Sequence, residues 1–254
     1  MSGTGPASRA EICVVACAEA WRGDGEVLAA PMGLIPTIAA RLARLTFAPD
    51  LLLTDGEALL VADVPAVGAR ARVAEGWLPY RRHLALAMGG RRHVMMGASQ
   101  LDRYGNQNIS CIGAWERPDR QLLGVRGAPL NTLNHPTSYW IPRHSPRVLV
   151  ERVDMVCGVG NDRAAAAGPS AMRHHCLRRV VTDLAVLDFA TPDGRLRVRS
   201  LHPDVTPEEV RQATGFPLDV PAGAPRTRRP TPAELHLIRE VLDPQGLREK
   251  EVPR

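Results

Sequence analysis

Three polar segments follow short apolar runs of strand character, and they contain the residues best suited to chemistry. The first is Thr54-Asp55-Gly56-Glu57, which places two carboxylates directly after the apolar residues 51–53. A carboxylate at a strand end can act as a nucleophile, a general base or an electrostatic partner. An Asp-Gly pair is also an ordinary turn, so a turn without chemistry is the alternative.

Asparagine side chains and a glycine-containing loop mark the other two segments. Residues 102–108 read Asp-Arg-Tyr-Gly-Asn-Gln-Asn, and the amides of Asn106 and Asn108 could donate to a carbonyl oxygen; a simple turn is again the alternative. Residues 124–131 contain Arg126, Gly127 and Asn131 and run from a strand end into a helix start. Backbone N–H groups at such a place can hold an oxyanion or a phosphate.

Several familiar site patterns do not occur in the sequence. It has no Gly-x-Ser-x-Gly elbow, no phosphate loop ending in Gly-Lys and no Gly-x-Gly-x-x-Gly after the first strand. The histidines lack metal-ligand spacing. Five cysteines without a Cys-x-x-Cys pair favour reduced, mostly buried thiols over a disulfide frame or a zinc site. No metal or redox cofactor is implied.

The elements that must position these segments alternate between helix and strand in the first hundred residues. Ser8-x-x-Glu11 is a capping box that predicts a helix through residue 21. The pattern further predicts helices over 34–45 and 79–90, and strands over 26–30, 50–54 and 93–98. This order predicts an open, mostly parallel α/β sheet with crossover helices, whose functional crevice lies beyond the carboxyl ends of the strands.

The second half is predicted to be richer in strands. These cover residues 109–113, 121–125, 147–156, 177–189 and 196–200, with Pro192-Asp193-Gly194 as the turn of a final hairpin. Residues 161–169 are expected to form a mobile surface loop, and residues 207–214 a short helix. We predict one α/β domain over residues 1–220, a Pro- and Arg-rich linker over 221–232, and a C-terminal helix and tail over 233–254 packing on the same domain.

Composition limits the class of protein. Of 254 residues, 44% are apolar and 23% charged, which is typical of a chain with a packed core. The net charge of +5 is spread along the chain without a basic stripe interleaved with aromatics, so nucleic-acid binding is not supported. No long apolar run and no secretory leader is visible, so we expect no membrane association and a cytoplasmic location.

Four stretches resemble the β subunits of class I coenzyme A transferases: residues 51–57, 102–108, 180–189 and 201–216, the last being the most specific. The resemblance covers residues 8–245 and implies an open α/β fold that pairs with a homologous α subunit. The nucleophile of those transferases is a glutamate in a Ser-Glu-Asn/Ser-Gly turn. Asp55 occupies that position here with a side chain one methylene shorter, and residues 125–131 depart from the family's glycine-rich loop.

Within this family, residues 91–95, 97–110 and 126–140 make the sequence similar to the β subunits of actinobacterial hydrolases that cleave a cholesterol ring. This similarity implies hydrolysis of a ring carbon–carbon bond in a cyclic oxo-acyl-CoA. It also implies an α2β2 complex whose main catalytic glutamate belongs to the α subunit. Coenzyme A then enters as part of the substrate, and no separate cofactor is expected.

Under this hypothesis the candidate residues fall into two groups. Asp55 and Glu57 are secondary catalytic carboxylates, and the predicted substrate-binding residues are Asn106, Asn108, Arg126, Gly127 and Asn131. An Arg126 guanidinium can pair in a fork with a substrate carboxylate. Two alternatives stay open: a coenzyme A transferase with Asp55 as nucleophile, and a subunit that has only a structural role.

Overall fold

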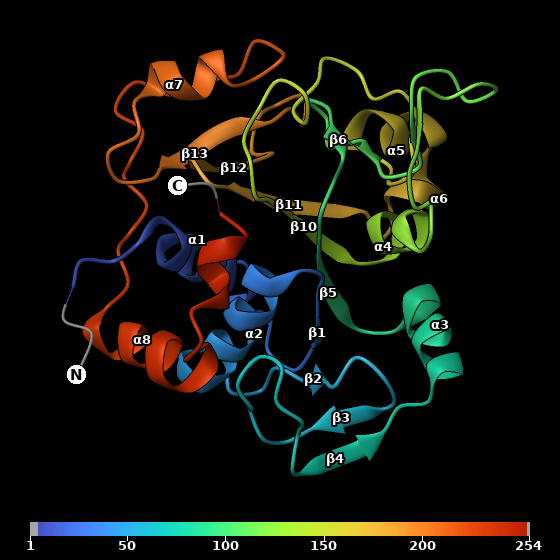
Figure 1. Ribbon diagram of the computed structural model, residues 1–254. Coiled ribbons are helices and arrows are strands. Elements are labelled where there is room, and N and C mark those ends of the chain that lie inside the picture. Colours follow the sequence, from blue (N-terminus) through green and yellow to red (C-terminus); the bar gives the residue numbers. More distant parts are fainter. Residues whose placement is uncertain (1–4, 253–254) are drawn as a thin grey trace. The chain divides into compact units, whose positions relative to one another are not determined.

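The computed structural model describes residues 5–252, which divide between two compact units (Figure 1). Unit 1 comprises Met1–Met95 and Arg228–Arg254, and unit 2 comprises Met96–Thr227. Unit 2 is therefore inserted into the sequence of unit 1. Residues 1–4 and 253–254, which the predicted ranges 1–220 and 233–254 include, lie outside the described residues.

Unit 1 combines a parallel strand pair with two packed helices. Strand β1 (Leu28–Pro31) runs parallel to β5 (Arg92–Met96). Helix α1 (Arg9–Ala18) packs against α2 (Leu34–Thr46), and apolar residues spaced three and four apart are buried on both. The predicted capping box is present, since Ser8 Oγ accepts from the Glu11 N–H at 3.2 Å. These predictions are confirmed.

The apolar run over residues 50–54 differs from its prediction as a simple parallel strand. Leu52 does bridge Leu28 in the parallel sense. However, β2 (Leu53–Thr54) pairs antiparallel with β3 (Leu59–Val61), which pairs antiparallel with β4 (Ala74–Trp77). The Asp-Gly turn reverses the chain at once, so a small hairpin sheet replaces a direct crossover, and α3 (Tyr80–Gly89) follows β4.

The C-terminal segment completes unit 1. Helix α8 (Pro232–His236) continues as a π-helical stretch (Leu237–Leu242) and is followed by a 3-10 turn (Leu247–Lys250). The helix predicted at the start of the segment 233–254 therefore forms, over residues 232–242, with wider turns in its second half. Of the predicted linker over residues 221–232, the last residue already begins α8. Residues 221–231 contain no strand or helix apart from isolated bridges such as that of Arg226 with Leu201.

Buried ion pairs join the two sequence ends of unit 1. The Glu11 side chain is 1% exposed and accepts from Arg239 Nε at 2.7 Å and from Arg248 Nη2 at 2.9 Å. A further carboxylate, Glu251, accepts from the Ile35 N–H at 2.6 Å, in the first turn of α2. Residues near the C-terminus therefore satisfy groups on both N-terminal helices.

Unit 2 contains a mixed sheet, as expected for an α/β chain with a strand-rich second half. Strand β10 (Pro136–Ile141) is parallel to β11 (Cys176–Thr182), whereas β12 (Ala185–Asp188) and β13 (Arg197–Leu201) continue the sheet antiparallel. The Tyr139-Trp140 pair of β10 is buried and packs in the core.

A buried histidine follows the carboxyl end of β10. His144 Nδ1 lies 3.0 Å from Thr182 Oγ1, and its Nε2 lies 2.9 Å from Thr214 Oγ1. Burial lowers the pKa of His144 to about 4, so the ring is neutral near pH 7.

Three predictions for unit 2 are wrong. Residues 177–189 are not one strand, because the chain reverses at residues 183–184, where Thr182 Oγ1 accepts two backbone N–H groups. Residues 147–156 form loops with one bridge, between Leu149 and Leu101. Residues 161–167 form helix α5 (Asn161–Ala167), because alanine has the highest helix propensity and Gly168, at φ 92°, ends it.

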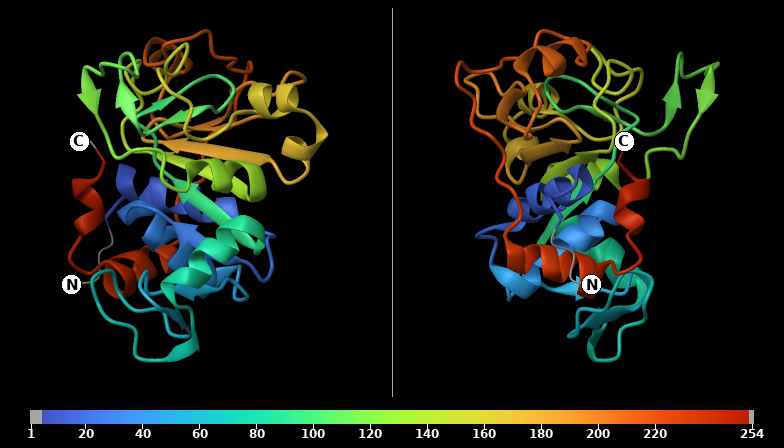
Figure 2. Two further views of the ribbon diagram at one scale, coloured as in Figure 1. Left: turned by 90° about the vertical axis from the view of Figure 1, so that its right-hand side faces the viewer. Right: turned by 60° about the vertical axis from the view of Figure 1, so that its left-hand side comes forward.

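Short elements in unit 2 carry the remaining candidate residues. Figure 2 shows the β8–β9 hairpin extending from its surroundings. The short elements are β6 (Gln100–Leu101), β7 (Gln107–Asn108), β8 (Cys111–Ile112), β9 (Arg120–Gln121), α4 (Ala128–Asn134), α6 (Pro169–Met172) and α7 (Pro207–Gln212). Among residues 5–252, no helix is long and apolar enough to cross a bilayer.

Candidate functional site

The turn after β2 holds Asp55 in a fixed position. One of its carboxylate oxygens, Oδ1, accepts from the backbone N–H groups of Glu57, Ala58 and Leu59 at 2.9, 3.0 and 2.9 Å. Slight burial opposes ionisation, but these three N–H groups hold the pKa of Asp55 below its ordinary value. Asp55 is therefore a charged, exposed side chain with one oxygen committed to the turn.

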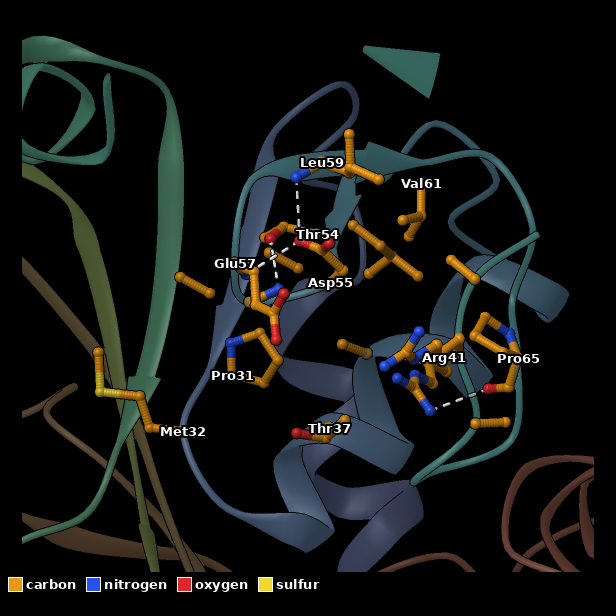
Figure 3. Close-up of a pocket in the computed structure, with 18 of the residues that line it drawn as sticks. Pro31, Met32, Thr37, Arg41, Thr54, Asp55, Glu57, Leu59, Val61 and Pro65 are labelled. Carbon is orange, nitrogen blue, oxygen red and sulfur yellow. Dashed lines mark hydrogen bonds between the residues drawn. The ribbon is translucent and has the colours of Figure 1, made fainter. Parts of the chain in front are cut away.

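Asp55 and Glu57 line a cavity of about 660 Å³ within unit 1 (Figure 3). Its walls come from the end of β1, from α2, from the turn over residues 54–57 and from the loop over residues 65–71. Three basic side chains, Arg41, Arg70 and His83, also line it. Ligand pockets commonly measure roughly 300–1,000 Å³, so this cavity has room for part of a substrate.

Asn106 lies in a tight polar network of unit 2. Its Nδ2 donates to Asp102 Oδ2 and to Asp162 Oδ1, both at 2.9 Å, and its Oδ1 accepts from the Gly160 N–H at 2.8 Å. The side chain is 1% exposed. Burial raises the pKa of the neighbouring Asp102 above its ordinary value. The Asn106 amide is therefore fully engaged inside the chain, and its assignment to substrate binding stays a prediction.

The turn over residues 102–106 depends on Gly105. This residue has φ 83°, a region that glycine occupies without strain. A Cβ at this position would lie 2.5 Å from Leu177 Cδ1 and 2.8 Å from Phe189 Cζ. The conformation and the close packing both require glycine.

Asn108 is also buried and engaged. Its Nδ2 donates to Gln100 Oε1 and to the Cys111 carbonyl, both at 2.7 Å, and its Oδ1 accepts from the Ser110 N–H at 2.9 Å. These bonds join the β6–β7 pair to the start of the β8–β9 hairpin. Asn108 thus shapes the loops around it, and its contact with a substrate stays a prediction.

Arg126 differs from the two asparagines. It is exposed, it has φ 47°, and no hydrogen bond or ion pair is described for its side chain within residues 5–252. A positive φ is uncommon for a residue with a side chain and often marks a functional position. Of the predicted substrate-binding side chains, the Arg126 guanidinium is therefore the one presented outward.

Gly127 and Asn131 lie on the same helix start. Gly127 is the N-cap of α4, and its carbonyl accepts from the Asn131 N–H at 3.0 Å. The Ala128 N–H donates to the Val125 carbonyl at 3.1 Å, so this N–H is already used. Asn131 is buried, with Nδ2 3.8 Å from Met96 Sδ. Arg126, Gly127 and Asn131 thus share one short stretch, as the sequence suggested.

The loop over residues 157–160 joins helix α4 to the turn that contains Asn106. No pattern in the sequence singled it out as part of a site. The Val159 N–H donates to Thr132 Oγ1 of α4 at 2.9 Å, and the Gly160 N–H binds Asn106. A Cβ on Gly160 would lie 2.6 Å from the Asn106 nitrogen. The only sign of this contact in the sequence is the Gly-x-Gly pattern of residues 158–160, because glycine allows two backbones to approach closely.

Within residues 5–252 no group of three or more His, Cys, Asp or Glu side chains is arranged to hold a metal ion. The unit 1 cavity offers the carboxylates Asp55 and Glu57 together with its basic side chains. Unit 2, taken by itself, offers the exposed guanidinium of Arg126.

The chain belongs to the coenzyme A transferase family, whose model matches residues 84–213. More particularly, it is 55% identical over 245 residues to the cholesterol ring-cleaving hydrolase IpdB subunit of Rhodococcus jostii RHA1, covering 96% of each chain. It is 54% identical over 248 residues to the IpdB subunit of Mycobacterium tuberculosis H37Rv, covering 96% of this chain and 98% of that one.

The fold is similar to a chain in the crystal structure of Rhodococcus jostii RHA1 IpdAB, with a TM-score of 0.93 and 53% identity, covering 98% of this chain and 99% of that one. The predicted α/β fold and the resemblance to this family are confirmed.

Proposed function

We propose that this chain is the β subunit of a hydrolase that cleaves a ring carbon–carbon bond in a cyclic oxo-acyl-CoA during cholesterol degradation. One observation carries the proposal: 55% identity to the IpdB subunit of the cholesterol ring-cleaving hydrolase over 96% of both chains. The match to a chain of IpdAB supports a homologous α subunit as the partner. We propose that the two chains form an α2β2 complex. The fold alone would not decide between activities.

The proposed reaction is a retro-Claisen-type hydrolysis. A base on the partner subunit takes a proton from water, and the hydroxide adds to the ring ketone carbon, whose oxygen becomes an oxyanion. When the oxyanion collapses, the bond to the neighbouring ring carbon breaks. Its electron pair passes to the adjacent carbonyl as an enolate, which then takes up a proton. Hydrogen-bond donors hold both negative charges, and coenzyme A remains attached as part of the substrate.

This chain contributes polar residues of each unit to the reaction. Arg126 pairs with a substrate carboxylate through its free fork of donors. Gly127 and Asn131 shape the loop that presents it, while Asn106 and Asn108 hold the neighbouring loops in place. Asp55 and Glu57 act as secondary carboxylates. These steps need only a base, water and hydrogen-bond donors, so the proposal includes no metal or redox cofactor.

The rival proposal is coenzyme A transfer with Asp55 as the nucleophile. Two features disfavour it: three backbone N–H groups hold one carboxylate oxygen, and the side chain is one methylene shorter than glutamate. A misplacement of about 1 Å can lower a rate on the order of a hundredfold. Incubation of the complex with an acyl-CoA and borohydride would label Asp55 if the rival were correct.

The compartment we propose is the cytoplasm. Four of the five cysteines are buried thiols in the described chain, which is typical of residues used for packing. A fractionation of the native cells, with activity followed in each fraction, tests this.

The test of the function is an assay of the co-purified complex on ring-containing acyl-CoA substrates. Arg126→Ala should lower kcat/KM by about 10- to 100-fold, the range for one hydrogen-bonded charge pair. Arg126→Lys should recover part of it, because lysine restores the charge without the fork.

The matched control is Arg120→Ala, which removes an exposed arginine on β9. Full activity of Arg126→Ala in a stable complex would favour a purely structural subunit. Absence of ring cleavage by the unchanged complex would refute the function itself.

A further inference from the structure

Arg41 is a half-buried cation on the wall of the unit 1 cavity. It lies on α2, and the hydrogen bond described for its guanidinium joins Nη1 to the Pro65 carbonyl at 2.9 Å, as Figure 3 shows. Desolvation lowers the pKa of Arg41 below its ordinary value. No carboxylate within residues 5–252 lies at ion-pair distance from it.

Arg44, on the same helix, provides a direct comparison. Its Nη1 also donates to a backbone carbonyl, that of Val61, at 2.8 Å. Unlike Arg41, it has a counter-ion, since Nη2 lies 3.5 Å from Glu75 Oε2. The two arginines therefore share a helix and a carbonyl contact and differ in whether the chain neutralises them.

A half-buried charge without a counter-ion is unusual, because desolvation penalises it and native structures normally pair such groups. The carboxylate of Asp55, in the same cavity lining, makes no ion pair with Arg41 and binds backbone N–H groups instead. No carboxylate among residues 5–252 therefore neutralises the Arg41 guanidinium.

His83 is a second side chain of the cavity lining with an unsatisfied polar group. It lines the cavity from α3, and its Nε2 is buried without a hydrogen-bond partner among the described residues. A buried nitrogen without a partner costs free energy unless a bound group satisfies it. The cavity lining thus presents a guanidinium without a counter-ion on α2 and a buried imidazole nitrogen without a partner on α3, among the described residues.

We propose that Arg41 and His83 bind an anionic oxygen group of the acyl-CoA substrate inside the unit 1 cavity; this rests on the proposed function for the identity of the ligand. The group is a phosphate of the coenzyme A portion or a carboxylate of the acyl portion, since a guanidinium recognises both through paired N–H···O bonds. Asp55 and Glu57 repel an anion from the turn, which confines it to the region of Arg41 and His83.

The test measures ligand affinity by calorimetry on the complex with its α subunit. The variants are Arg41→Gln and, as the matched control, Arg44→Gln. The probes are coenzyme A, dephospho-coenzyme A and the glutaryl thioester of N-acetylcysteamine, which carries a carboxylate but no phosphate.

We expect Arg41→Gln to weaken binding of the correct probe by about 10- to 100-fold and Arg44→Gln to leave it unchanged. If Arg41→Gln lowers the affinity for coenzyme A alone, the bound group is the 3′-phosphate. If it lowers the affinities for coenzyme A and dephospho-coenzyme A equally, the bound group is the diphosphate. If it lowers the affinity for the glutaryl thioester, the bound group is an acyl carboxylate.

A second measurement separates binding from a structural role. Without ligand, Arg41→Gln should keep or raise the unfolding temperature, because it removes an unneutralised charge, whereas Arg44→Gln should lower it by removing the partner of Glu75. Unchanged affinity for all three probes, or no binding of any of them by the unchanged complex, refutes the proposal. Dissociation of the complex by Arg41→Gln also refutes it, since the partner would then supply the anion.

His83→Phe provides the parallel test for the second donor and should weaken the same probe as Arg41→Gln. The binding assay does not require turnover. A complex that binds coenzyme A through Arg41 but opens no ring would overturn the proposed hydrolysis and leave this site standing.

Discussion

Asn106 was predicted to bind substrate, but the fold already uses every hydrogen-bonding group of its side chain. Asn106→Asp tests this use, because aspartate has nearly the same shape and replaces the donor with a third carboxylate. The variant loses the two bonds at 2.9 Å to Asp102 and Asp162. Each such bond to a charged group contributes about 1.5–3 kcal/mol, and a buried carboxylate without a partner adds to the loss.

We therefore expect Asn106→Asp to lower the free energy of unfolding by about 3–5 kcal/mol at pH 7, a large part of the 5–15 kcal/mol typical of folded proteins. Burial already raises the pKa of Asp102, and the new carboxyl shares that environment. Its pKa in the folded state should exceed the unfolded value of about 3.9, so its penalty should shrink as the pH falls toward 4.

Urea unfolding followed by circular dichroism at pH 7.5, 6 and 4.5 measures both effects. Gln245→Glu is the matched control, since it adds the same charge at an exposed position and should change stability by less than about 0.5 kcal/mol. If Asn106→Asp unfolds at the wild-type midpoint and yet loses ring cleavage, the side chain is free for substrate and the reasoning is wrong.

Three further predictions concern stability. Gly105→Ala should cost about 2–4 kcal/mol, because it combines a left-handed backbone with severe overlap, and a thermal melt of wild-type shape and midpoint would contradict this. Glu11→Ala removes the carboxylate that binds the half-buried Arg239 and one of the two carboxylates that bind the buried Arg248, which keeps Asp243. It should cost about 2–4 kcal/mol in urea unfolding, whereas the exposed Glu26→Ala should cost little. The pKa of His144 falls from 6.5 to about 4 on folding. The contribution of this histidine to the free energy of unfolding should therefore be complete above pH 6.5 and decline by about 3 kcal/mol as the pH falls toward 4. A His144→Gln variant that keeps the full acid sensitivity of the wild type would refute this.

The elements with local signals were predictable from the sequence. The helix after Ser8 forms because its capping box and apolar spacing are both local, and the α/β alternation of the first hundred residues follows from similar patterns. The Asp-Gly turn after residue 54 was predicted as an alternative, but its hairpin pairing with β3 was not, because no local pattern shows which segment a strand will pair with. The reversal at residues 183–184 was not predicted, because a continuous apolar run gives no sign of where a strand turns back. The sequence predicts a loop over residues 161–169 because the alanines there lie between polar residues, yet the helix propensity of alanine produces helix α5.

Candidate site residues could be predicted from the sequence only where they stand next to a recognisable local pattern. Asp55 with Glu57, and Arg126 with Gly127, were identified from their places after apolar runs. The engagement of Asn106 depends on Asp162, which is 56 positions away, and no pattern around either residue reveals that contact. Arg41 was missed for the same reason: its lack of a counter-ion is a property of the folded cavity wall, and the sequence shows only an arginine on a helix.

The ion pairs of Glu11 constrain the order in which the protein can be made. Arg239 and Arg248 follow Glu11 by 228 and 237 positions, so they leave the ribosome long after it. Because domains usually fold as they emerge, the inserted segment over residues 96–227 is available long before the N-terminal helix acquires its arginines. A nascent chain therefore carries an unneutralised acid in an unfinished core until residues 239 and 248 have been synthesised. Loss of these two arginines would thus destabilise the first helix as well as the segment that contains them.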